Sequence, residues 1–500
     1  MLAGVLAVAG GVAASEAVSG LLHLRASPVV AVAEEIIEIT PGGIAEWFIH
    51  LVGRNDKHFL IAGVLIGLVV VGAACGLAAR RRRAWGVLIL GLVGLVGVIG
   101  EKTRAHATIL DTIPAIAAAL VSITLLNWLL NWAGDNNPKA YLNDADMSRR
   151  AFLIRSGMVA AGAVVLASTG RFLSHSRDAL EAARRNLRLP VRAAREPAGV
   201  SVGVAGVSPW LTPIGDFYRI DTSLAPPLLN PKDWQLRIHG MVRKELTLSF
   251  QDLLSRDLTD AWVTLCCVSN NVGGPLIGNA HWSGVRVADL LTEAGVEDRA
   301  DAVLSTSTDG WTAGTPIEAL TDDRNAMLAL AMDGQPLPIE HGFPVRMVVP
   351  GLYGFVSATK WLVDLEVTRF SKFTAYWTDR GWSAQAPVKT SSRIDVPRSG
   401  NRVGAGTVPV GGVAWAQHRG ITAVEVRVDD GDWQPATLGR EPTIDSWVQW
   451  RFEWQASAGD HTLTVRAIDG DGVVQSGADV GVVPNGAEGY HSVSVSVDNG

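Results

Sequence analysis

The segments Thr264-Leu-Cys-Cys-Val-Ser-Asn-Asn271 and His341-Gly-Phe-Pro-Val-Arg-Met-Val-Val-Pro-Gly351 decide how this chain is read. The first offers adjacent thiols at the end of a β-like run, and thiolate sulfur is a preferred ligand of soft metal ions. The second places Arg346 among apolar residues, and a buried arginine needs an anionic partner. Together the two segments predict a metal that is held by a thiolate and by an anionic organic cofactor.

Composition limits the architecture and the class of partner. A chain of 500 residues exceeds what one hydrophobic core organises, so we expect two or three domains. The part before about Gly170 is typical of a membrane protein, and the part after Pro209 is typical of a soluble one. The net charge of −6 argues against nucleic acid as a partner. Three cysteines, Cys75, Cys266 and Cys267, cannot build a disulfide framework.

Apolar runs in the first part are candidates for spanning helices, which need roughly 20 residues. The runs are Met1–Leu22, His58–Ala79, Trp85–Gly100, Ile109–Trp132 and Phe152–Ser168. The basic cluster Arg80–Arg83 and the acidic residues of segment 34–46 lie at opposite ends of the second run. The positive-inside rule therefore places the basic cluster in the cytoplasm and the acidic segment outside.

Four crossings return the chain to the cytoplasm before Ser148. There, Ser148-Arg-Arg-Ala-Phe-Leu153 and the apolar stretch after it resemble a twin-arginine export signal, and a fifth transmembrane helix is the alternative. The resemblance implies export of a domain that folds around its cofactor first. Both alternatives predict a multi-pass protein of the cell membrane, with everything after Arg171 on the extracytoplasmic side.

Short β-like runs separated by turns predict a mixed α+β domain after Pro209. The expected strands are Trp234–Ile238, Ala261–Leu265, Val303–Thr306, Val345–Val349 and Trp361–Val367, and the expected helices are Ser249–Ser255 and Val287–Ala294. Period-two alternation after Pro397 predicts a small β-sandwich. Its expected strands are Val410–Trp415, Ala423–Val428, Val448–Trp454 and His461–Ala467. The residues after Pro484 are expected to form a disordered tail.

Six motifs, in their order and spacing, carry a resemblance to a known family. They are Asp216-Phe-Tyr-Arg219, Thr264–Asn270, His281-Trp-Ser-Gly284, Asp309-Gly-Trp311, His341–Gly351 with Lys360-Trp361, and Gly412-Val-Ala-Trp-Ala416. The stretch Phe217–Arg369 resembles the molybdopterin domain of the sulfite oxidase family, and Val410–Gln475 is similar to its immunoglobulin-like dimerisation domain.

The resemblance completes the predicted domain organisation. We expect transmembrane α-helices in residues 1–147, a twin-arginine-like helix in 148–170 and a linker in 171–208. An α+β molybdopterin-binding domain is expected in 209–395, an immunoglobulin-like β-sandwich in 396–484 and the tail in 485–500. The family's β-module pairs with its own copy, which implies a homodimer.

The resemblance also assigns the site, with Mo-molybdopterin as the cofactor. Cys267, followed by Asn270, matches the cysteine that ligates molybdenum, whereas Cys266 is expected to be buried filler. The cofactor-binding positions correspond to Tyr218, Arg219, Asn270, His341, Arg346 and Lys360, with Ser357 or Thr359 as a further donor. Trp282 matches the tryptophan that lines the substrate side, so Cys267, Arg219 and Trp282 are the expected catalytic residues.

One departure from the family leaves the substrate open. Sulfite oxidases carry arginines just after the cysteine motif, where this chain has Asn271-Val-Gly-Gly274. Fewer fixed positive charges weaken the binding of a small dianion. The implied oxygen-atom transfer could therefore be sulfite oxidation or the reduction of sulfoxides, including oxidised methionine. A membrane protein that binds a partner without catalysis is a third alternative.

The route of the electrons is also an expectation. The sequence contains no Cys-x-x-Cys-His haem motif. The electrons of a two-electron reaction must nevertheless leave or arrive singly. We therefore expect a separate electron-transfer partner, either a cytochrome or a quinone-linked protein.

Overall fold

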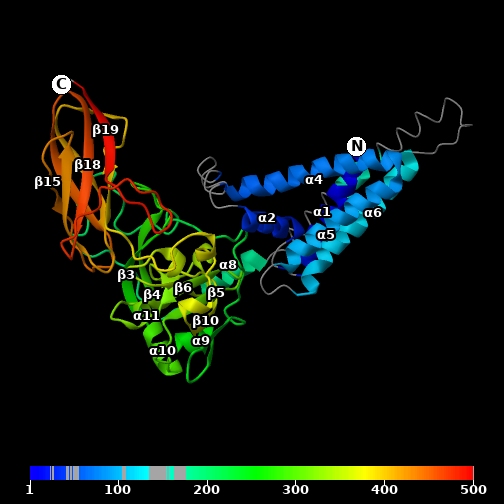
Figure 1. Cartoon of the computed structure of the whole chain (residues 1–500), viewed down its shortest axis with the longest axis horizontal. Helices are drawn as coiled ribbons and strands as arrows, with labels where there is room; N and C mark the ends of the chain where they lie inside the picture. Colours follow the sequence, from blue (N-terminus) through cyan, green and yellow to red (C-terminus); the bar gives the residue numbers. More distant parts are fainter. Residues whose placement is uncertain are drawn as a thin grey trace, which may run out of the picture. The chain divides into compact units, whose positions relative to one another are not determined.

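The computed structural model describes residues 1–22, 24, 27–40, 44, 48, 56–103, 108–133, 154, 157–162 and 176–498 (Figure 1). The chain forms two compact units, which are described separately below. The first comprises Met1–Ala183 with Thr222–Leu228, and the second comprises Arg184–Asp221 with Leu229–Gly500. The motif Ser148–Leu153 lies outside the described residues, so the export signal stays a prediction.

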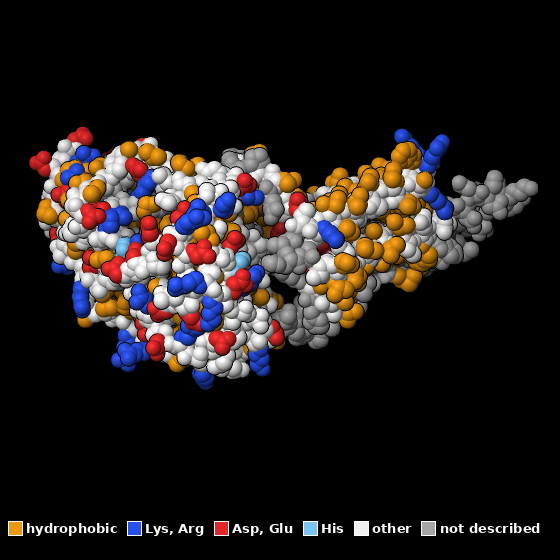
Figure 2. All heavy atoms as spheres, turned by 60° about the horizontal axis from the view of Figure 1, so that its bottom comes forward, with side chains coloured by type: hydrophobic (Ala, Val, Ile, Leu, Met, Phe, Trp, Pro, Cys, Tyr) orange, Lys and Arg blue, Asp and Glu red, His pale blue; other side chains and the backbone are white. Residues whose placement is uncertain are grey.

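Long apolar helices dominate the first unit. They are α1 (Leu2–Leu21), α4 (Asp56–Arg81), α5 (Arg83–Lys102) and α6 (Ile113–Ala133), accompanied by the shorter α2 (Pro28–Ile39). The described residues include four helices that are long and apolar enough to cross a membrane, and these coincide with the first four expected runs. Figure 2 shows hydrophobic side chains gathered over the surface of these helices. Exposure of so many apolar side chains is unfavourable in water and is compatible with a lipid environment.

Glycines allow two of these helices to approach closely. A methyl group added to Gly4 of α1 would lie 2.0 Å from the carbonyl oxygen of Gly72 in α4. Small residues at such contacts are typical of helix packing within a bilayer, where close backbone approach replaces the hydrophobic driving force.

The first half of the second unit contains two sheets, of which the first is mixed and the second is antiparallel throughout. One sheet has the strand order β2-β1-β10-β5-β6, and the other has β3-β4-β7-β8, with β9 paired to β7. The strands of the first sheet are β1 (Gln235–Gly240), β2 (Leu246–Ser249), β5 (Ala302–Ser307), β6 (Thr312–Pro316) and β10 (Leu362–Thr368). Those of the second are β3 (Thr259–Cys266), β4 (Ile277–Arg286), β7 (Met327–Met332), β8 (Gln335–Pro336) and β9 (Arg346–Val348). The helices include α9 (Phe250–Leu254), α10 (Val287–Ala294) and α11 (Glu318–Thr321). Helix α8 (Ser176–Asn186) begins in the first unit and ends in the second.

The expected strands of this half fall on β1, β3, β5, β9 and β10, and both expected helices are present. Sequence analysis missed β4 and β7, although both lie inside the second sheet. All six residues of β7 are buried. A strand that is covered on both faces has no polar alternation to reveal it.

The C-terminal half of the second unit consists of two further sheets around one core. The first has the order β11-β13-β17-β16 and the second has β12-β19-β18-β14-β15. Their bounds are β11 (Ser391–Val396), β12 (Asn401–Gly404), β13 (Gly406–Trp415), β14 (Ile421–Val428), β15 (Gln434–Pro435), β16 (Thr437–Leu438), β17 (Val448–Ala456), β18 (Gly459–Asp469) and β19 (His491–Asp498). Trp450 from one sheet and Leu463 from the other share the buried cluster between them.

The prediction of a disordered tail in residues 485–500 is wrong. Strand β19 pairs antiparallel with β18 and parallel with β12. Its valines Val493, Val495 and Val497 are buried in the core, and its serines alternate with them. The preceding Pro484-Asn-Gly-Ala-Glu-Gly489 resembles a loop, and this obscured the period-two pattern that follows it.

Candidate active site

The metal-ligand candidate lies directly after a strand end. Strand β3 ends at Cys266, and the loop 267–276, here called the cysteine loop, leads into β4. The amide of Cys267 donates to the carbonyl of Leu276 at 2.9 Å, which closes the base of the loop. The amide of Asn270 donates to the carbonyl of Cys267 at 3.0 Å, and Asn270 Oδ1 accepts from the amide of Leu276 at 2.8 Å. Asn270 therefore fixes the turn that presents Cys267.

The two thiols differ in their surroundings. Cys266 belongs to the hydrophobic core, together with Val268 and Tyr353, which fits its expected role as filler. Cys267 is also buried, and burial raises the pKa of its thiol. A bound metal cation would reverse this effect, because metal ligation requires the thiolate.

The second feature of the site is a buried cation. Arg346 begins β9 and is only 5% exposed. Its guanidinium donates to the carbonyls of His341 (3.2 Å), Ala358 (3.3 Å) and Met347 (3.4 Å), and it lies 5.0 Å from the ring centre of Trp282. Among the described residues, no carboxylate forms an ion pair with it. Burial lowers the pKa of Arg346 to about 10. The geometry is that of a site whose ligand supplies the negative charge.

A glycine brings the cationic segments together. Gly342 follows the short helix η3 (Ile339–His341) and has a φ of 108°. A methyl group there would lie 2.9 Å from Cβ of Arg346 and 3.2 Å from Cα of Lys360. Burial, and then the charges of Arg346 and Lys360, lower the pKa of His341 to about 3, so its ring is neutral. The ring of Phe217 packs against His341 edge-on at 5.5 Å.

One carboxylate serves two of the expected cations. Asp221 Oδ2 lies 2.7 Å from Nζ of Lys360 and 2.8 Å from Nε of Arg219. The side chain of Asp221 is 4% exposed, whereas that of Arg219 is 33% exposed. Burial lowers the pKa of Lys360 to about 8, although Asp221 opposes this shift. Sequence analysis missed Asp221, and its only signal was its position two residues after Arg219.

The phenol of Tyr218 is influenced electrostatically by the two cysteines and by Arg346. Burial raises its pKa well above the usual value, the nearby Cys267 and Cys266 raise it further, and Arg346 lowers it. Its ring stacks on Phe217 at 5.4 Å. The phenol is therefore protonated at neutral pH and is close to both halves of the site.

The remaining predicted residues have internal partners. Ser357 Oγ donates to the carbonyls of Leu352 and Tyr353, and Thr359 Oγ1 is hydrogen-bonded to Ser305 Oγ at 2.6 Å. Both side chains are fully buried. In this structure the two hydroxyls stabilise the loop before β10, and contact of either one with a cofactor stays a prediction.

Trp282 is placed beneath Arg346. Its ring is fully buried in β4, and Nε1 donates to the carbonyl of Val263 at 3.1 Å. Phe217 packs edge-on against it at 5.8 Å. The ring thus supports the guanidinium, and its expected contact with substrate stays a prediction.

Comparison with known proteins identifies the family of this chain. A family model described as an oxidoreductase molybdopterin binding domain matches residues 223–377. Human mitochondrial sulfite oxidase is 30% identical over 309 residues, which cover 52% of this chain and 56% of that protein. The uncharacterized oxidoreductase YuiH of Bacillus subtilis is 34% identical over 149 residues, which cover 30% of this chain and 72% of that protein. The chain belongs to the sulfite oxidase family.

A solved structure supports the family fold. The sulfane dehydrogenase SoxCD from Paracoccus pantotrophus superimposes with a TM-score of 0.51 at 24% identity, covering 64% of this chain and 92% of that one. This likeness concerns the fold alone. The chain spans little more than half of the length of the mitochondrial sulfite oxidases.

Proposed function

We propose that this member of the sulfite oxidase family is a membrane-anchored, extracytoplasmic oxidoreductase that uses Mo-molybdopterin for oxygen-atom transfer. One observation carries the proposal: buried Arg346 lacks a carboxylate partner among the described residues, and both Arg346 and Cys267 influence the pKa of Tyr218. A soft sulfur donor on one side and a buried unpaired cation on the other fit a metal attached to an anionic organic group.

Each residue has a role in holding the group. Bound molybdenum cofactor supplies two-electron oxygen-atom chemistry. Cys267 would hold the metal through its thiolate, and Arg346 and Lys360 would compensate the negative charge of the organic part. Neutral His341 offers a donor and an acceptor without adding charge. Tyr218 retains its proton and can donate a hydrogen bond.

The choice of substrate depends on Arg219 and Asp221, here called the rim of the site. Arg219 is the exposed cation that would orient an anionic oxygen, as sulfite oxidation requires. A second candidate, reduction of a neutral sulfoxide, is favoured by Asp221, because its carboxylate already compensates both Arg219 and Lys360. A neutral sulfoxide oxygen needs a hydrogen-bond donor rather than net positive charge.

The membrane assignment rests on the helices of the first unit. The basic cluster Arg80–Arg83 lies between the apolar helices α4 and α5, which favours the cytoplasm for this connection. With this orientation the chain returns to the cytoplasm after α6. The predicted fifth crossing or twin-arginine export at residues 148–170 then takes the second unit to the extracytoplasmic side. We further propose a homodimer through the C-terminal sheets, and a separate cytochrome or quinone-linked protein as the electron partner.

Direct turnover assays on the detergent-solubilised full chain test the proposal. Sulfite with a one-electron acceptor dye tests the oxidase, and dimethyl sulfoxide or methionine sulfoxide with reduced viologen tests the reductase. We expect turnover in one of the two directions. Molybdenum-loaded protein that is inactive in both directions would argue against oxygen-atom transfer and for the non-catalytic alternative.

A further inference from the structure

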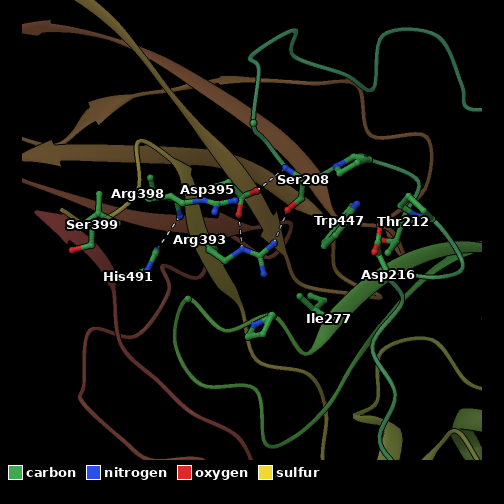
Figure 3. Close-up of a pocket in the computed structure, with 17 residues that line it drawn as sticks. Ser208, Thr212, Asp216, Ile277, Arg393, Asp395, Arg398, Ser399, Trp447 and His491 are labelled. Atoms are coloured by element: carbon green, nitrogen blue, oxygen red, sulfur yellow. Dashed lines mark hydrogen bonds and ion pairs between the residues drawn. The ribbon is translucent and has the colours of Figure 1, made fainter. Parts of the chain in front are cut away.

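The C-terminal half of the second unit contacts the cysteine loop directly. Arg393 of β11 is buried, and its Nη1 donates to the carbonyl of Gly274 at 2.6 Å. Its Nε lies 2.7 Å from Asp395 Oδ1, and its Nη2 donates to Ser208 Oγ at 3.0 Å (Figure 3). Asp395 compensates the charge, so the remaining donors of the guanidinium are available to fix position rather than to attract an anion.

A second strand of the same half contacts the adjacent loop residue. Gly273 has a φ of 74°, and a methyl group there would lie 2.2 Å from Cδ2 of His491 in β19. His491 Nδ1 accepts from the amide of Ile394 at 3.0 Å, next to Arg393. Strands β11 and β19 therefore hold two successive residues of the loop through linked contacts.

The contacts at Gly273 and Gly274 are connected to the metal-ligand candidate. The amide of Gly274 donates to the carbonyl of Asn271 at 2.8 Å, and a methyl group at Gly274 would lie 2.7 Å from Asn270 Oδ1. The amide of Asn270 in turn donates to the carbonyl of Cys267. A displacement at Gly274 would thus be passed to Cys267 through Asn270.

A cavity makes these contacts more important. It has a volume of about 490 Å³ and is lined by Gly273 of the loop and by Ser208, Arg393, Asp395 and His491 (Figure 3). Close-packed side chains would otherwise fix the outer side of the loop. Because the cavity removes part of this packing, the position of the loop depends more on the contacts of Arg393 and His491 with it.

We propose that Arg393 and His491 are positioning residues for Cys267, through which the C-terminal sheets help to set the ligand geometry at the metal. The proposal rests on the proposed function where it concerns the metal. The contact between the C-terminal sheets and the loop can be tested without the metal.

Hydrogen–deuterium exchange of the full chain tests the contact itself. In Arg393→Met, we expect the amides of Asn270, Gly274 and Leu276 to exchange roughly tenfold faster, the effect of losing one charge-assisted hydrogen bond. Arg393→Lys should give a smaller increase. The control is Arg466→Met, because Arg466 pairs with Glu425 inside the C-terminal sheets at 2.6 Å. Two results for Arg393→Met would overturn the proposal. One is unchanged exchange in the cysteine loop, and the other is an equal rise of exchange in β17.

A second variant controls for misfolding of the first. A second measurement, made on molybdenum-loaded protein, tests the effect on the metal separately from the contact. His491→Gln should also accelerate exchange of the loop. In molybdenum-loaded protein, Arg393→Met should shift the sulfur-to-metal absorption band and lower kcat at nearly constant KM. An unchanged band and unchanged loop exchange in loaded protein would refute the positioning role. Wild-type protein without molybdenum would instead refute the proposed function, and the exchange data would still decide the contact.

Discussion

Two arginines of the site present opposite arrangements of the same functional group. Arg346 is almost fully buried and donates to backbone carbonyls, without an acidic partner in the described part of the chain. Arg219 is one-third exposed and shares Asp221 with Lys360. Because an uncompensated buried charge is costly, the region around Arg346 is built for a ligand that brings its own negative charge. The positive charge of Arg219 is already compensated by Asp221. The region around Arg346 is therefore suited to an anionic ligand, whereas the region around Arg219 is not strongly cationic.

Loss of the Cys267 thiol should have the largest effect on activity. Cys267→Ser removes the soft donor, and we expect oxygen-atom transfer to fall by more than the roughly 10-fold to 100-fold that outer-shell substitutions cost at metal sites. Activity and the sulfur-to-metal absorption band are the measurements. Cys266→Ser is the matched control and should retain both. Equal losses in the two variants would remove the assignment of Cys267.

Exchange of each arginine for methionine tests the comparison itself. Arg346→Met should weaken cofactor retention by roughly 10-fold to 100-fold, since hydrogen bonds to charged groups contribute about 1.5–3 kcal/mol. Arg219→Met should reduce retention less and raise KM more, because Arg219 is exposed and already paired. Molybdenum content after extended dialysis and steady-state kinetics measure the two effects. The reverse order would show that the charges are assigned wrongly.

Removal of the Asp221 carboxylate, which Arg219 and Lys360 share, should increase the affinity of the rim for anions. Asp221→Asn leaves Arg219 without compensation, so sulfate should inhibit roughly threefold to tenfold more strongly, in line with about 1 kcal/mol of attraction at a partly solvated site. Inhibition constants at fixed ionic strength measure this change. Glu245→Gln, which affects the exposed pair with Arg237, is the control. Sulfate inhibition that is unchanged by Asp221→Asn would exclude Asp221 as the reason for a neutral rim.

The smallest expected effect concerns pH. Burial lowers the pKa of Lys360 to about 8 in the protein alone, and a bound anion would raise it again. Anion affinity should therefore be highest below pH 8 and should fall as the pH rises above 8, when Lys360 loses its proton. Cofactor retained after dialysis at pH 7 and at pH 9.5 reports the difference. Lys360→Arg, which stays charged, should abolish it, and equal retention at both pH values in wild type would contradict the role of Lys360.

The sequence predicted the parts of the site that depend on local pattern. Arg346 lies in an apolar run, so its burial could be inferred, and the turn-bounded strands β3, β9 and β10 were placed correctly. Asp221 escaped prediction because its role depends on Lys360, which is 139 residues away in the chain. The contacts of Arg393 and His491 escaped for the same reason. They arise only when the C-terminal sheets pack against the cysteine loop.

The molybdenum-to-protein ratio of the purified full chain tests the central claim most directly. Elemental mass spectrometry on protein from a host that makes molybdopterin should give a ratio near one, and the ratio should fall in Arg346→Met. A ratio near zero in correctly folded wild-type protein would contradict the account, because buried Arg346 would then have no anionic ligand to explain it.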